Sequence, residues 1–164
     1  GGVVVELKML TESMEDYLEM FYRIYSRQGY VRPIDLSAAI GVQPSSVTRM
    51  IQKLHEADFI TYEKYRNISL TPVGLQYGQF LVWRDETLKE FLYLFGDQAG
   101  IEEQVEGIEH YLTPQTMCIF RNLLSFFKAH PQELEGFLAI RQGRAYPDGH
   151  ELGLLRAWLF KHSE

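Results

Sequence analysis

The chain has 164 residues, enough for one core of good size or two small ones, and its net charge of −6 argues, taken globally, against a nucleic-acid binder. Its only cysteine, Cys118, excludes an intrachain disulfide framework and a thiolate metal cluster, and it fits a reducing, cytoplasmic setting. No apolar stretch reaches the roughly 20 residues that span a bilayer, so we expect no membrane partner.

The charge is unevenly distributed along the chain. Residues 22–71 hold seven Lys and Arg against four Asp and Glu, a net charge of +3, which leaves −9 for the rest. This asymmetry is typical of an acidic body that carries a basic DNA-contacting region. Ten Tyr and ten Phe also leave a large apolar surface to cover in a core or across a subunit interface, which is compatible with a dimer.

The residue pattern of the N-terminal third of the sequence predicts a helix-turn-helix. Ser13 and Asp16 form a capping-box pattern ahead of a first helix over residues 14–27. A second, short helix over residues 34–40 follows Pro33, and Gly41 supplies a tight turn. A third helix begins at Pro44. Its apolar residues fall on one face: Val47, Met50, Ile51 and Leu54. Two short helices joined by a turn with glycine are typical of the motif.

The next segment predicts a hairpin and then helices only. Residues 59–63 and 68–70 are rich in β-branched and aromatic side chains and flank a polar tip, as in the wing of a winged helix. A long helix is expected over residues 72–95, and further helices over 100–111, 114–128, 133–142 and 151–162. The expected fold is therefore mostly α with a small β-hairpin wing, an N-terminal winged helix-turn-helix followed by an all-α domain.

The helix that begins at Pro44 carries polar residues opposite its apolar stripe. Small hydroxyls, amides and cations are the types that contact phosphates and base edges in the major groove. The candidates are Gln43, Ser45, Ser46, Thr48, Arg49, Gln52 and Lys53, with Lys64 and Arg66 at the hairpin tip. Arg49 is the best candidate for reading guanine. On the helix alone, an ordinary solvated face explains these residues equally well, and the hairpin that follows favours DNA binding.

Two acidic groupings stand at helical spacing. Asp16 and Glu19 are three residues apart on the first helix, and Glu106, Glu109 and His110 are clustered on a later one. Carboxylates arranged in this way repel one another unless solvent or a cation separates them. Oxygen donors with one imidazole point to manganese or iron. Each grouping also has an ordinary explanation, as a capping-box partner or as solvated helix surface.

Four stretches of the chain resemble a known family. They are residues 13–17 (SMEDY), 44–48 (PSSVT) with Met50 and 52–54 (QKL), 62–66 (YEKYR) and 105–110 (VEGIEH). In this order, over about residues 13–128, they closely resemble the manganese transport regulators of the diphtheria toxin repressor family. The resemblance implies a winged-helix DNA-binding domain at 11–71, a helical dimerisation and metal-binding domain at 72–130 and a C-terminal helical extension at 131–164.

The resemblance also implies the metal ligands. They are Asp16, Glu19, Glu106, Glu109 and His110. The iron-responsive branch of the family has Met and Cys where this chain has Asp16 and Glu106, and carboxylates in place of sulfur favour manganese. Fe²⁺ or another divalent transition metal is the expected substitute for Mn²⁺.

One ligand position departs from the family pattern. Where the family has a His on the long helix, this chain reads VWRDE at 82–86, which places Asp85 there. The six ligands would then hold five carboxylates and one neutral His, so two divalent ions leave a net charge of −1. Either a binuclear site persists with altered geometry, which is our expectation, or the second metal is weak or absent.

The resemblance implies a repressor of manganese homeostasis genes, not an enzyme. As a homodimer it would bind double-stranded operator DNA when Mn²⁺ bridges its DNA-binding and dimerisation domains. Two alternatives remain open from the residues: a winged-helix regulator of another ligand, either Fe²⁺ or a small organic molecule, and a metal-dependent hydrolase. The sequence has no HExxH motif and no arrangement of a nucleophile with a base, which disfavours the hydrolase.

Overall fold

The structure is a computed structural model that describes residues 10–62, 68–96, 100–141 and 152–161. The chain divides into two compact units between Trp83 and Arg84, inside the long helix α4 (Pro72–Leu94). No helix in these described ranges is both long and apolar enough to cross a membrane.

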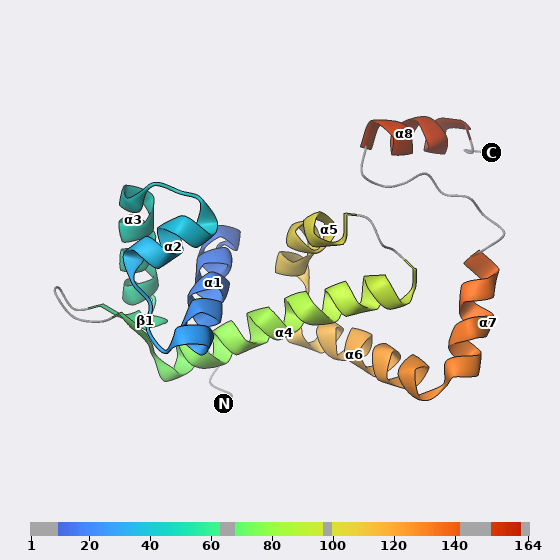
Figure 1. The fold of residues 1–164 in the computed structure, drawn as a ribbon, viewed down its shortest axis with the longest axis horizontal. Coiled ribbons are helices and arrows are strands. Elements are labelled where there is room, and N and C mark those ends of the chain that lie inside the picture. The colour runs from blue at the N-terminus through green and yellow to red at the C-terminus, as the bar shows by residue number, and fades with distance from the viewer. Residues whose placement is uncertain (1–9, 63–67, 97–99, 142–151, 162–164) are drawn as a thin grey trace, which may run out of the picture. The chain divides into compact units, whose positions relative to one another are not determined.

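The first unit contains three helices, a hairpin and the first part of α4 (Figure 1). Helices α1 (Glu12–Gln28), α2 (Pro33–Ile40) and α3 (Pro44–Glu56) pack against one another, and β1 (Ile60–Thr61) pairs antiparallel with β2 (Ser69–Leu70). The expected winged helix-turn-helix is confirmed.

The core of this unit follows the helical periodicity of the sequence. All four apolar residues predicted on the third helix are buried: Val47, Met50, Ile51 and Leu54. They pack in one cluster with Leu18, Phe21 and Ile24 of α1 and with Leu36 of α2. Gly41 ends α2 with a φ of 76°, a left-handed conformation that glycine adopts without steric cost and that produces the tight turn before α3.

The start of the first helix differs from our expectation. Thr11, not Ser13, is the N-cap, and its hydroxyl accepts a hydrogen bond from the Met14 backbone N–H at 3.2 Å. The helix therefore begins two residues earlier than the Ser13 capping box requires. Asp16 lies beyond the first turn, so capping does not explain its presence.

The hairpin is shorter than expected and has a third partner. Its strands pair Ile60 with Leu70 and Thr61 with Ser69, and Val31, from the segment between α1 and α2, forms an isolated antiparallel bridge with Ile68. The predicted tip with Lys64 and Arg66 lies outside the described residues.

Thr71 connects the hairpin to α4. Its hydroxyl donates to the Asp58 carbonyl at 2.6 Å and accepts from the Gly74 backbone N–H at 3.0 Å, so it caps α4 as the sequence predicts. Gly74 lies so close to the hairpin that a Cβ there would stand 1.8 Å from the Phe59 carbonyl oxygen. The helix and the hairpin thus approach as closely as backbone allows.

In the second unit, the regular structure of the described residues is all helical. The unit contains the last part of α4, then α5 (Ile101–Ile108), a single 3₁₀ turn (Glu109–Tyr111), α6 (Pro114–Ala129), α7 (Pro131–Arg141) and α8 (Leu152–Lys161). We expected one helix over residues 100–111, and the structure ends that helix at Ile108.

Aromatic rings hold α4, α6 and α7 together. The Phe91 and Phe120 rings meet edge to face, with their centroids 4.8 Å apart. The Phe137 ring of α7 meets the Phe95 ring edge to face, with centroids 5.1 Å apart, and it also contacts the Phe127 ring. Such pairs add to the stability gained by burial. An ion-pair cluster of Glu90 with Arg121 and Lys128 also joins α4 to α6 and lowers the pKa of Glu90, chiefly through the Lys128 hydrogen bond.

We expect Gly74→Ala to destabilise the protein by about 3 kcal/mol, because the new methyl group meets backbone that cannot rotate away. The matched control is Gly136→Ala on α7, where a Cβ meets nothing within 4 Å. That change should be neutral or stabilise by up to about 1 kcal/mol. Urea unfolding midpoints of the two variants and the wild type measure the difference, and equal midpoints for both variants would contradict the close approach.

Candidate metal centre and nucleic-acid interface

The outer face of α3 is polar and exposed. Residues Ser45, Ser46, Thr48, Arg49, Gln52 and Lys53 are all exposed on the side opposite the buried stripe, and Gln43, also exposed, is the N-cap residue. The Thr48 hydroxyl donates to the Pro44 carbonyl at 3.1 Å, and Gln52 donates to Glu56 at 3.2 Å. This face therefore presents the hydroxyls and cations that duplex DNA contacts require.

His55, which the sequence analysis did not single out, attaches the hairpin to α3. Its Nδ1 lies 3.1 Å from the Ile60 carbonyl oxygen and 3.3 Å from the backbone nitrogen of Tyr62. The imidazole therefore fixes the first hairpin strand to the last turn of the helix whose face would read DNA. A histidine at a helix end has no sequence signal that separates this role from a surface position.

The entry to α2 is fixed by an ion pair that the sequence analysis also missed. The Arg32 guanidinium donates to both Asp35 oxygens, with Nη2 to Oδ1 at 2.9 Å and Nε to Oδ2 at 3.1 Å, and Gln28 donates to Oδ2 at 3.1 Å. Arg32 also lies over the Tyr30 ring at 5.7 Å. The Arg32 hydrogen bond lowers the pKa of Asp35 to about 2, and the same pair raises the pKa of Arg32.

In the first unit, α1 carries two of the predicted metal ligands. Asp16 is exposed and Glu19 is half-buried, one turn apart on the helix, and Glu19 pairs with Arg23 at 3.3 Å. The neighbouring Glu15 is buried and accepts a hydrogen bond from the Tyr77 hydroxyl at 3.0 Å, which fixes α1 against the first part of α4. This hydrogen bond helps to hold the helix that carries Asp16 and Glu19.

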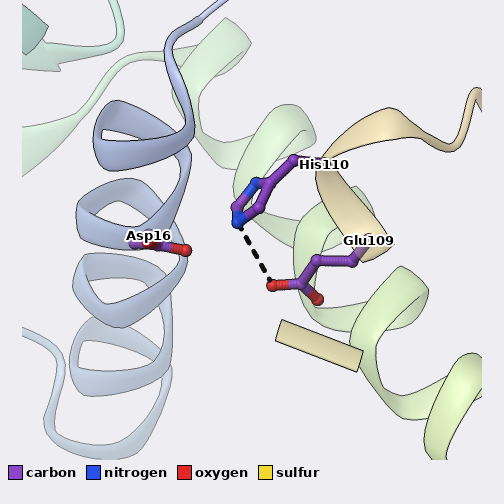
Figure 2. A group of neighbouring side chains, drawn as sticks. All are labelled: Asp16, Glu109 and His110. Atoms are coloured by element: carbon purple, nitrogen blue, oxygen red, sulfur yellow. Dashed lines mark ion pairs between the residues drawn. The ribbon is translucent and has the colours of Figure 1, made fainter. Parts of the chain in front are cut away.

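In the second unit, the predicted ligand Glu109 lies near two others, Asp85 and His110. The His110 ring turns toward the Glu109 carboxylate, with Nε2 3.8 Å from Oε1, and both side chains are only 5% exposed (Figure 2). An Asp85 carboxylate oxygen lies within 4.8 Å of one from Glu109. Two buried carboxylates beside an imidazole form a donor set that fits manganese or iron. Asp16, the third residue in Figure 2, belongs to the first unit.

Glu106 does not join these three side chains. It is exposed on α5, and it belongs to no cluster of three metal-ligating groups within the described part of the chain. Glu106 therefore stays a predicted ligand, and it is Glu109 that lies close to Asp85 and to His110.

A lysine that the sequence analysis passed over contacts the Asp85 carboxylate. Lys89 lies one turn further along α4, with its Nζ 2.9 Å from Asp85 Oδ2. The four-residue spacing of acid and base is visible in the sequence, but such pairs are common on solvated helices. What could not be read from the spacing is the burial of the carboxylate.

Two family models match the chain. The iron dependent repressor N-terminal DNA binding domain matches residues 9–68, and the iron dependent repressor metal binding and dimerisation domain matches residues 71–137.

Curated relatives are similar over most of the chain. The HTH-type transcriptional regulator MntR of Geobacillus thermodenitrificans is 42% identical over 135 residues, which is 82% of this chain and 96% of the relative. The protein of the same name from Listeria welshimeri is 43% identical over 133 residues, 80% of this chain and 94% of the relative.

Solved structures share the fold at lower identity. The IdeR of T. acidophilum superposes with a TM-score of 0.59 at 22% identity, over 73% of this chain and 56% of that one. The manganese regulator SloR superposes with a TM-score of 0.61 at 22% identity, over 71% of this chain and 55% of that one. This chain thus spans little more than half the length of either.

The low pKa of Asp35 leads to a pH prediction. Because the folded pKa is about 2 and lies below the ordinary value of about 3.9, the pair stabilises the fold above about pH 4, and this contribution is lost as the pH falls through about 2. We expect Arg32→Gln to return the pKa of Asp35 toward the ordinary value. NMR titration of the Asp35 carboxyl group measures this pKa, and Arg121→Gln is the control that should leave it unchanged. An unshifted midpoint in Arg32→Gln would contradict the assignment of the cause.

Proposed function

Because this chain belongs to the iron dependent repressor family, we propose that it is a metal-dependent DNA-binding transcriptional repressor of manganese homeostasis genes. The observation that carries the proposal is the buried Glu109 carboxylate, which lies near the Asp85 carboxylate and near the His110 imidazole, in a chain that also holds a winged helix-turn-helix. The relatives are named as transcriptional regulators, so the hydrolase alternative is set aside and the protein is not an enzyme.

The chain holds a DNA-binding domain and a dimerisation domain. We assign residues 11–71 to the first, 72–130 to the second together with metal binding, and 131–164 to a C-terminal helical extension. A homodimer would place two α3 helices in successive major grooves of an operator, about 34 Å apart. Such a regulator acts where the chromosome is, so we place it in the cytoplasm.

We propose six residues as metal ligands. They are Asp16, Glu19, Asp85, Glu106, Glu109 and His110. Five oxygen-donating side chains and one imidazole suit Mn²⁺, and Fe²⁺ or another divalent ion would substitute for it. Two ions per chain remain our expectation, with Glu106 as the ligand that receives least support, because its side chain is exposed.

The switch follows from the charges of these ligands. When bound, a divalent metal supplies the positive charge that lets carboxylates from both domains converge. Without it, like charges on α1 and on the second unit repel one another and broaden the range of orientations of the DNA-binding domain. By thermodynamic linkage, operator DNA should then tighten metal binding by the same factor as metal tightens DNA binding.

We expect DNA binding to require Mn²⁺. We expect Glu109→Gln to abolish this Mn²⁺-dependent binding, because the substitution removes one buried ligand. The probe is a duplex selected from a random pool with Mn²⁺ present, and the readout is a gel shift with and without chelator. The control is Glu102→Gln, an exposed acid on α5 that we do not propose as a ligand. Size-exclusion chromatography should show that both variants keep the wild-type oligomeric state.

DNA binding that is unaffected by chelator and by restored Mn²⁺ would overturn the proposal. Loss of binding in Glu102→Gln as well would show that the acidic surface of α5 acts in general, without a specific site.

Two substitutions on α3 separate base reading from phosphate contact. We expect Arg49→Gln to weaken specific binding by roughly 1–3 kcal/mol and to relax discrimination at one base pair. Lys53→Gln should instead weaken binding to all sequences alike and lower the slope of log K against log salt by about 1. Fluorescence anisotropy with cognate and single-mismatch duplexes at several salt concentrations measures both. The same behaviour in both variants would contradict the division of roles.

A further inference from the structure

Lys89 of α4 is a cation in contact with a second-unit ligand, and the proposed function leaves it without a role. Its Nζ stands 2.9 Å from Asp85 Oδ2, four residues earlier on the same helix. The two side chains differ in exposure, at 36% for Lys89 and 9% for Asp85. An ordinary surface pair keeps both charges in water and contributes little. Here the carboxylate is withdrawn from water, and so its attraction to the ammonium ion is less screened.

The Asp85 carboxylate stands between a positive and a negative neighbour. Lys89 contacts one of its oxygens, while a Glu109 carboxylate oxygen lies within 4.8 Å of Asp85. A divalent ion that binds Asp85 and Glu109 would therefore share the Asp85 carboxylate with an ammonium ion. The ion would either compete with Lys89 for Oδ2 or experience its repulsion at close range.

The burial of two neighbouring carboxylates gives a second argument. Asp85 and Glu109 are both buried, and a carboxylate oxygen of one lies within 4.8 Å of an oxygen of the other. In the metal-free protein two such carboxylates repel each other, and the Lys89 ammonium ion reduces this repulsion.

We infer that Lys89 sets the affinity of the metal centre: it holds the Asp85 carboxylate in the metal-free protein and lowers the affinity for an ion that binds Asp85. This inference rests on the proposed function and deepens it. The centre would then have two classes of metal-binding site, one of higher affinity and one whose affinity Lys89 lowers. The weaker class would make the protein respond at a higher metal concentration than its carboxylates alone would allow.

The test is Mn²⁺ binding by the full-length, metal-free protein. Calorimetry gives the affinities, and the EPR signal of free Mn²⁺ gives the number of ions bound per chain. The variants are Lys89→Gln, the charge-conserving control Lys89→Arg, Asp85→Asn, and the double variant Asp85→Asn with Lys89→Gln. Circular dichroism checks that each is folded.

We expect Lys89→Gln to tighten the weaker class about tenfold, or to add a second ion where the wild type binds one. Lys89→Arg should show no such gain. In the Asp85→Asn background, Lys89→Gln should change the affinity less than twofold, because the carboxylate that couples the two is gone.

Two results would overturn the inference alone: wild-type affinity and stoichiometry in Lys89→Gln, or the same gain with and without the Asp85 carboxylate. In either case the wild type still binds Mn²⁺ and the proposed function stands. A wild type that binds no Mn²⁺ would overturn both.

Discussion

The burial of carboxylates next to one another is the constraint on which this protein depends. Glu109 and Asp85 are both buried, and charged groups removed from water are costly unless cations or hydrogen bonds compensate them. Lys89 compensates Asp85 from one side, and the His110 ring turns toward Glu109. A divalent ion would compensate them more strongly. The repulsion between these neighbouring carboxylates is thus what a bound metal would relieve in the proposed function.

Several contacts fix α1, α3 and the hairpin of the DNA-binding unit to the first part of α4. Gly74 brings α4 against the backbone of Phe59, Thr71 ties the end of the hairpin to Asp58, and His55 ties its beginning to α3. The Tyr77 hydroxyl holds the buried Glu15 of α1. Helix α1, the hairpin and α3 are therefore fixed to the first part of α4 as one body, so any change in the orientation of α1 also changes that of α3.

Helix α4 belongs to both units. It begins at Pro72 under the hairpin, passes the boundary between Trp83 and Arg84 without a break, and ends among the rings that pack α6 and α7. Asp85 and Lys89 follow directly after that boundary. A proposed metal ligand and the cation that pairs with it therefore lie at the point on the helix where one unit gives way to the other.

The sequence by itself determined the winged helix-turn-helix, the polar face of α3 and the choice of donor types, because helical periodicity, proline at a first turn and the chemistry of oxygen and imidazole donors are local properties. Only the tertiary structure decided which of the spaced acids are buried. Glu106 and Glu109 have the same spacing as many helical pairs, yet Glu106 is exposed and Glu109 is buried. Asp85 and Lys89 form an unremarkable pair in the sequence. Their significance depends on how little water reaches Asp85, and that is determined by residues distant in the chain.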